Sequence, residues 1–282
     1  MSPYIVELGK FHIRWYSVFI VIGVLVSYIS IKIKMKRFRA SNEFVTNIIF
    51  WTIIFGIIGA RAYYVAFNWK YYSQNLLEIL QIWNGGIAIH GALIAGILTI
   101  ILFCKQAYAK TLLTLDIIAP SVLFAQALGR WGNFFNQEAY GSMTTLEALK
   151  SYKIIPEFVI KGMYINGNYY LPMFYFESIL CLIGVIVLII ISRFRYIRNG
   201  QQFGFYLVWY SLIRFFIEKY RTDSLMLGSF KIAQIVSVIL FFVGLIIIVI
   251  QNNKPKLEEL YNSSQKIENE RFQVEKEGEQ NV

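Results

Sequence analysis

The chain has 282 residues, of which 57% are hydrophobic and only 16% are charged, and its mean hydropathy is +0.52. Soluble domains are about one quarter charged, so this composition excludes an ordinary soluble domain and favours a polytopic membrane protein. The formal net charge of +10 is better explained by lysine and arginine that set membrane topology than by binding to nucleic acid.

A helix needs about 20 apolar residues to cross a bilayer, and seven stretches of the sequence approach this length. In chain order these stretches are roughly 14–33, 44–66, 86–103, 115–130, 173–192, 203–219 and 231–250. The fourth and the sixth are the least apolar. The sequence therefore predicts an all-α integral membrane protein with seven transmembrane helices.

Lysine and arginine are distributed unevenly between the connections. Most of the 27 basic residues follow the first, third, fifth and seventh predicted helices, including the run KIKMKRFR after the first. The positive-inside rule then places the N-terminus outside and, with seven spans, the C-terminus in the cytoplasm.

The domain organisation follows from these helices. We expect one transmembrane domain over residues 1–250 and a polar cytoplasmic tail over 251–282. The longest outside segment, about 131–172, contains an Asn-Gly-Asn triplet and two prolines, and we expect a cap with turns. Cys104 and Cys181 lack a metal-binding spacing and are interpreted as apolar filler, so neither a metal site nor a cofactor is predicted.

Ionisable residues inside a membrane are costly and by default indicate function. Arg61 lies near the outer end of the second predicted helix, His90 near the start of the third and Arg130 at the end of the fourth, while Arg214 and Glu218 lie on the sixth. In the predicted orientation all five fall in the outer half of the bilayer. This common depth predicts a functional site there.

The sixth predicted helix carries a polar face. Tyr210, Arg214, Glu218 and Arg221 are spaced four, four and three residues apart, which places them on one side of a helix. Glu218 is therefore expected to hold Arg214 or Arg221 in a fixed orientation. The alternative is an internal ion pair that only fixes helix packing.

The stretch GRWGNFFNQEAYG at 129–141 surrounds an arginine with hydrogen-bonding side chains. Arg130 is followed by Asn133, Asn136, Gln137 and Glu138. An arginine that only anchors a helix end at the interface does not need these neighbours. The segment is predicted to close a polar pocket.

Simpler explanations stay open for other residues. His90 could be a hydrogen-bonded histidine at a helix contact, because Gly91 and Ala95 are spaced as small residues at such contacts. Asp116 is expected to complement the dipole of its own helix as a first-turn acid.

Arginine at the lipid–water boundary suggests a phosphate ligand. Its planar guanidinium matches a phosphate with two parallel N–H groups and does not lose its charge. Two such residues near headgroup depth indicate an anionic phospholipid whose phosphate is bound or leaves. The sequence contains no Walker loop, HExxH or GxSxG motif, which argues against ATP-driven pumps and common hydrolases.

Five motifs together resemble the signature blocks of the prolipoprotein diacylglyceryl transferase family. They are RWYS at 14–17, GARAYYV at 59–65, HGALIAG at 90–96, GRWGNFFNQEAYG at 129–141 and RFFIEKYR at 214–221. The resemblance runs from the first predicted helix to the seventh. In one departure, Gln137 stands where a glycine is expected before the glutamate.

The resemblance implies a bacterial plasma-membrane enzyme that transfers a diacylglyceryl group from phosphatidylglycerol to the lipobox cysteine of a prolipoprotein signal peptide. Glycerol phosphate would leave and a thioether would form. The motif positions that carry over as important are Tyr16, His90, Arg130, Asn133, Glu138, Gly141, Tyr210, Arg214 and Glu218.

Roles at these positions are expectations. Arg130 and Arg214 would hold the phosphate and stabilise it as it leaves, His90 would help to generate the thiolate or order the pocket, and Arg61 is a weaker candidate for headgroup binding. Asn133 and Glu138 would contact glycerol hydroxyls or Arg130 itself. The alternative function is a membrane transporter or binding protein for an anionic lipid or solute.

Overall fold

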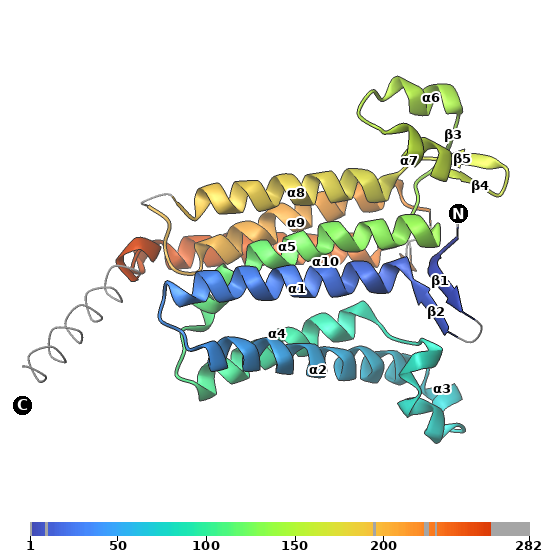
Figure 1. Cartoon of the computed structure of the whole chain (residues 1–282). Helices are drawn as coiled ribbons and strands as arrows, with labels where there is room; N and C mark the ends of the chain where they lie inside the picture. Colours follow the sequence, from blue (N-terminus) through green and yellow to red (C-terminus); the bar gives the residue numbers. More distant parts are fainter. Residues whose placement is uncertain (1, 9–10, 194–195, 223–225, 229, 261–282) are drawn as a thin grey trace, which may run out of the picture. The chain divides into compact units, whose positions relative to one another are not determined.

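The structure is a computed structural model that describes residues 2–8, 11–193, 196–222, 226–228 and 230–260. It is mostly helical and divides into a larger unit, Met1–Ile31 with Leu115–Val282, and a smaller unit, Lys32–Thr114 (Figure 1). Each of the seven predicted stretches coincides with one long helix. These helices are α1 Trp15–Lys36, α2 Asn42–Phe67, α4 Ile89–Gln106, α5 Thr111–Asn136, α8 Met173–Ile191, α9 Gln201–Tyr220 and α10 Ile232–Ile250.

Five helices within the described residues are long and apolar enough to cross a membrane. They are α1, α2, α5, α8 and the segment Ile232–Asn253 that contains α10. Helix α4 is shorter than the rest, and α9 does not reach the same hydropathy. As the sequence predicted, α5 and α9 are the least apolar of the long helices.

The core of the larger unit lies between α5, α8 and α9. Leu123, Cys181 and Ile213, one from each helix, belong to the same buried apolar cluster. Helix α9 also packs along α8 and α10, and Figure 1 shows these helices running side by side. Buried apolar contacts therefore fix α9, although its sequence is the least suited to lipid.

Helix α5 continues beyond its predicted end. Residues 131–136 were assigned to the cap, but α5 ends only at Asn136. Apolar packing accounts for the extra turns, because Phe134 is buried and the ring of Phe135 stacks on Trp15 at 4.7 Å between centroids. The helix ends where Gln137 adopts a φ of 52°, which an α-helix cannot accommodate.

A small folded cap follows between α5 and α8. It contains β3 Met143–Thr144, α6 Leu146–Ser151, α7 Glu157–Gly162, β4 Tyr164–Ile165 and β5 Asn168–Tyr170. The three strands form an antiparallel sheet in the order β3-β5-β4. The chain reverses between β4 and β5 at Asn166 and Gly167, whose φ angles of 48° and 86° are those of a tight hairpin turn.

Two further strand pairs lie outside the long helices. The strands β1 Tyr4–Leu8 and β2 Phe11–Arg14 pair before α1, and β6 Met226–Leu227 pairs with β7 Phe230–Lys231 before α10. The sequence predicted an all-α protein; the structure is mostly helical, and these strands were not predicted.

The predicted tail begins with ordered contacts. After η3 Gln251–Asn253, the backbone N–H of Leu257 donates to the carbonyl of Ile197, and that of Asn199 donates to the carbonyl of Pro255. The start of the tail therefore binds the loop between α8 and α9, and residues 261–282 lie outside the described part of the chain.

In the smaller unit, α2 packs against α4 through small residues. A Cβ on Gly59 would lie 2.3 Å from the Cβ of Ala95 and 2.7 Å from the carbonyl oxygen of Gly91. This contact confirms the helix packing expected from the spacing of Gly91 and Ala95. The connection between the two helices contains α3 Trp69–Tyr72, η1 Leu76–Leu80 and η2 Ile82–Asn84.

Candidate active site

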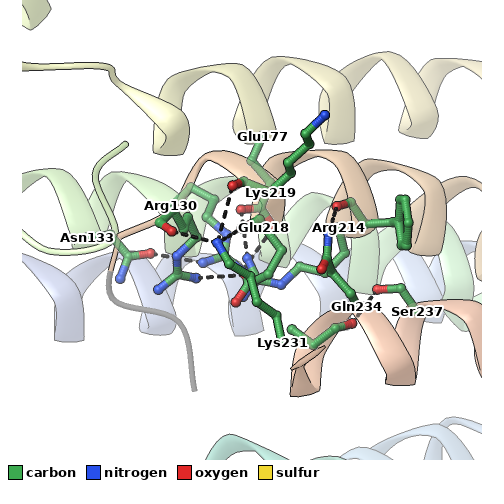
Figure 2. Close-up of polar contacts among 12 residues, drawn as sticks. Arg130, Asn133, Glu177, Arg214, Glu218, Lys219, Lys231, Gln234 and Ser237 are labelled. Carbon is green, nitrogen blue, oxygen red and sulfur yellow. Dashed lines mark hydrogen bonds and ion pairs between the residues drawn. The ribbon is translucent and has the colours of Figure 1, made fainter. Parts of the chain in front are cut away.

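Four ionised side chains meet inside the larger unit, and we call them the arginine–glutamate cluster. Arg130 comes from α5, Glu177 from α8, and Arg214 and Glu218 from α9. Glu177 stands between the arginines, with Oε1 3.1 Å from Nη2 of Arg130 and Oε2 3.4 Å from Nη1 of Arg214. Figure 2 shows these contacts as dashed lines.

Helix α9 supplies the second carboxylate of the cluster. Nη2 of Arg214 lies 2.7 Å from Oε2 of Glu218, one helical turn away. Nη1 of Arg221 lies 3.8 Å from the same oxygen. Glu218 thus contacts both Arg214 and Arg221, with the closer contact to Arg214, and its role in orienting them stays a prediction.

The two carboxylates are buried more deeply than the two guanidinium groups. The side chains of Glu177 and Glu218 are 2% and 3% exposed, against 19% for Arg130 and 17% for Arg214. Buried charges are tolerated when they are paired, and two arginines here match two glutamates. The carboxylates thus lie deepest in the cluster, and the two guanidinium groups remain partly exposed.

The guanidinium groups are not saturated by these partners. The contact between Arg130 and Oε1 of Glu177 is close but lacks hydrogen-bond alignment, and this oxygen accepts no hydrogen bond from the described residues. A guanidinium has five N–H groups. The cluster can therefore position two arginines and still leave N–H groups for an anion.

A relay of amide and carboxylate groups extends from Arg130 to the end of α5. Nη1 of Arg130 donates to Oδ1 of Asn133 at 3.2 Å, and Nδ2 of Asn133 donates to Oε1 of Glu138 at 2.8 Å. Asn136 donates to the same oxygen at 3.2 Å. Of the predicted residues, Asn133 thus contacts Arg130 directly, and Glu138 is linked to Arg130 through Asn133.

The bend after α5 turns Glu138 back toward this relay. Gln137 has a φ of 52° and Ala139 a φ of 58°, in the left-handed region that favours glycine. The backbone N–H of Glu138 donates to the carbonyl of Asn133 at 3.0 Å. This conformation explains why a glycine was expected at position 137.

Tyr16 packs against α5 at Gly132. A Cβ on Gly132 would lie 2.1 Å from Cδ2 of Tyr16, so only glycine lets the ring approach this closely. Gly141 is also confined, because its Cβ would lie 2.8 Å from Cγ of Met173 and 2.9 Å from Cβ of Leu171. Both glycines are required by close contacts, and one of them seats a predicted site residue.

Tyr210 lies beside the charged groups of the cluster. It interacts with Arg130, Arg214 and Glu177, and its ring stacks on Tyr206 at 6.2 Å between centroids. The larger unit thus brings most of its predicted site residues together around Arg130. The exceptions are Tyr16, which contacts Gly132, and Gly141, which lies in the cap beside Met173 and Leu171.

Arg61 has a separate environment in the smaller unit. Its guanidinium donates to four backbone carbonyls, those of Glu78, Ile79, Gly85 and Gly86. Its side chain is buried, and its charge lies over the ring of Tyr72 at 5.1 Å. These bonds use most of its N–H groups. Arg61 therefore organises the connection between α2 and α4, and few of its N–H groups are left to bind a headgroup.

His90 is the second residue of α4 and is half-buried. Its ring lies 6.0 Å from the ring of Tyr63 on α2. This contact belongs to the packing between α2 and α4. The role of His90 at the arginine–glutamate cluster stays a prediction.

Glu177 is the residue of the arginine–glutamate cluster that the sequence analysis does not single out. It is the only ionisable carboxylate in α8, whose sequence MFYFESILCLIGVIVLIII is otherwise almost wholly apolar. The signal was present, because a carboxylate within a membrane-spanning stretch needs a buried partner. Which arginines it serves could not be deduced, since both lie on other helices.

Comparisons with known proteins identify a family to which this chain is similar. A family model described as prolipoprotein diacylglyceryl transferase matches residues 3–250. Proteins named phosphatidylglycerol–prolipoprotein diacylglyceryl transferase from Staphylococcus haemolyticus and Staphylococcus saprophyticus are 45% and 44% identical to this chain. The alignments cover 90% of this chain in both cases, and 89% and 91% of the relatives.

A relative with the same name from Lactobacillus delbrueckii subsp. bulgaricus is 42% identical over 91% of this chain and 93% of its own length. The match therefore includes every long helix and all the residues of the arginine–glutamate cluster. The chain belongs to the prolipoprotein diacylglyceryl transferase family.

Proposed function

We propose that this chain transfers the diacylglyceryl group of phosphatidylglycerol to the lipobox cysteine thiol of a prolipoprotein, as the names of its relatives indicate. The observation that carries the proposal is the pair of arginines from α5 and α9 held by one buried glutamate. Two guanidinium groups in fixed positions suit a phosphodiester, which presents several acceptor oxygens.

The reaction is a direct displacement at carbon. The cysteine thiolate attacks the glyceryl carbon that bears the phosphate, the C–S bond forms and the C–O bond breaks. Glycerol phosphate leaves with the bonding electrons, so negative charge grows on its oxygen. Arg130 and Arg214 stabilise that charge, because preorganised donors are most effective where charge develops.

Asn133 and Glu138 complete the headgroup pocket. Their relay to Arg130 fixes the amide and the carboxylate beside the guanidinium. The free glycerol of the headgroup carries hydroxyl groups, which such side chains bind. Tyr210 lies beside the cluster, and the family motifs assign Tyr16 and Gly141 to the same pocket.

The membrane arrangement belongs to the same proposal. All seven long helices span the bacterial plasma membrane, the N-terminus lies outside, and the C-terminal tail 251–282 lies in the cytoplasm. Residues 1–250 then form the catalytic domain, and the cluster lies in the outer half of the bilayer. The outer end of α5 carries Arg130, and α9 runs outward to Glu218, which supports this depth.

One assay tests this function. The purified protein is incubated with phosphatidylglycerol vesicles and a lipobox peptide, and the peptide is analysed by mass spectrometry. We expect a mass increase of one diacylglyceryl group and release of glycerol phosphate. Lipid movement or binding without modified peptide would instead support a transporter or a binding protein.

The two cysteines are not expected to take part. Both Cys104 and Cys181 are free and buried, and a covalent route would need an exposed and activated nucleophile. The double variant Cys104→Ala, Cys181→Ala should keep transfer within about twofold of the wild type, because direct displacement forms no enzyme adduct. A diacylglyceryl group trapped on either residue during turnover would contradict direct displacement.

His90 is proposed to act as the base that generates the thiolate. A free cysteine thiol has a pKa of about 8.5, so only a few per cent is thiolate near neutrality. Imidazole is the side chain that most readily accepts a proton in this range. Because the arginines also favour the thiolate, the alternative is that His90 only orients a substrate.

The pH dependence of His90→Gln separates these roles. At saturating lipid, a lost base should cost most at low pH, and the deficit should shrink as pH rises toward the pKa of the thiol. Transfer by variant and wild type is measured from about pH 6.5 to 9. A deficit that stays constant over this range would assign His90 an orienting role.

A further inference from the structure

Helix α9 carries Tyr210, Arg214 and Glu218, and its start lacks a side-chain cap from its own sequence. Its first flanking residue is Gly200, with a φ of 93° and no side chain to accept hydrogen bonds. The N–H groups at the start of a helix and the carbonyls at its end need partners, particularly where water is scarce. In α9 two side chains from other elements, Asp116 and Lys231, supply such partners.

Asp116 on α5 satisfies the beginning of α9. Its Oδ2 accepts from the backbone N–H of Gly200, and its Oδ1 accepts from that of Phe203 at 2.7 Å. The side chain is fully buried. Asp116 was expected to complement the dipole of its own helix, but it lies in the second turn of α5 and complements that of α9.

Lys231 satisfies the other end. Its Nζ donates to the carbonyls of Glu218, Lys219 and Arg221 at 2.6, 3.2 and 2.8 Å. An ammonium has three N–H groups, and all three are used here. Figure 2 shows Lys231 reaching this turn from the start of α10. A cation at a helix C-terminus is also favoured by the helix dipole.

We propose that Asp116 and Lys231 are positioning residues that hold α9 in register, so that Arg214 and Glu218 meet Glu177 and Arg130. Asp116 lies on the same helix as Arg130, so it ties α9 to the element that carries the other arginine. Lys231 binds the carbonyl of Glu218, whose carboxylate pairs with Arg214.

The effect of losing this register follows from helix geometry. A shift of α9 by one residue moves Arg214 by about 1.5 Å along the axis. The present 3.4 Å contact between Arg214 and Glu177 would not survive such a shift. Displacements of about 1 Å at a reacting centre cost on the order of 10²-fold in rate, so holding both ends of α9 matters to catalysis.

The proposal rests on the proposed transfer function, and a double-mutant cycle tests it. Lys231→Met should lower kcat/KM for transfer about tenfold in the wild-type background. In an Arg214→Lys background, where the positioned group is already impaired, the same change should cost less than about twofold. The same cycle is measured for Asp116→Asn, which keeps only one acceptor oxygen.

Two further variants control this cycle. Lys231→Arg keeps the charge and the donors and should retain most activity. Lys161→Met removes an exposed lysine whose ion pair with Glu157 lies on the cap surface, and should leave transfer unchanged. Equal fold losses from Lys231→Met in both backgrounds would overturn the proposal, as would no loss in either.

Hydrogen exchange gives a second measurement that does not depend on transfer. If Lys231 holds the last turn of α9, Lys231→Met should speed exchange there about fivefold, in line with the loss of one helix cap, and leave α8 unchanged. If the wild type produces no modified peptide, the proposed transfer function is wrong. Hydrogen exchange still tests whether Lys231 holds the end of α9 in that case. Unchanged exchange in the last turn of α9 in Lys231→Met would contradict the proposal that Lys231 holds this turn.

Discussion

Arg130→Lys and Arg214→Lys should each lower transfer by on the order of 10²-fold or more, while the protein still inserts and folds. Lysine keeps the positive charge but replaces the planar fork with a single ammonium. Arg130 uses its fork to reach Glu177 and Asn133 together, and Arg214 uses its own to reach Glu177 and Glu218. An ammonium cannot span two such partners and also bind phosphate.

The measurement is kcat/KM for modification of the lipobox peptide, together with the yield of folded protein after purification. Arg198→Lys is the matched control, because Arg198 donates to the carbonyl of Lys254 and takes no part in the cluster. Near-wild-type turnover by both cluster variants would show that a positive charge alone supports transfer. Bidentate phosphate binding by the guanidinium groups would then be wrong.

The contacts of this site that could be predicted are those between residues at helical spacing along the chain. Arg214 and Glu218 are one helical turn apart, so their contact follows from the period of an α-helix and is present at 2.7 Å. The seven long helices follow from hydropathy in the same way. Both features depend only on residues that are close along the chain.

The parts that were missed depend on contacts between distant segments. Glu177 was overlooked because its partners, Arg130 and Arg214, are supplied by two other helices. Asp116 was assigned to its own helix, although its partners Gly200 and Phe203 lie more than eighty positions along the chain. The extra turns of α5 depend on the ring of Trp15, which precedes them by more than a hundred residues.

Glu177 itself provides the second large effect. Its carboxylate is almost fully buried between two guanidinium groups, so Glu177→Gln leaves two cations facing each other with only Glu218 to balance them. Breaking a buried pair by removing one partner costs about 3–5 kcal/mol. The variant should unfold at a markedly lower temperature in detergent, and its transfer should fall because the arginines move apart.

The exposed ion pair between Glu157 and Lys161 supplies the control. Both side chains are at least 74% exposed, so Glu157→Gln should change the unfolding temperature little. A Glu177→Gln variant as stable as this control would mean that the arginines do not depend on the glutamate, and the balanced arrangement of charges would have to be abandoned.

Phosphatidylglycerol should restore part of the stability that Glu177→Gln loses. A ligand that binds only the folded state stabilises it in proportion to its affinity, and a phosphate between Arg130 and Arg214 supplies the negative charge that the variant lacks. The rise in unfolding temperature on adding this lipid should therefore be larger for Glu177→Gln than for the wild type. A lipid with a zwitterionic headgroup, whose own cation offsets its phosphate, should give a smaller difference. Equal shifts in variant and wild type would indicate that the headgroup phosphate binds elsewhere, and the cluster would then have only a structural role.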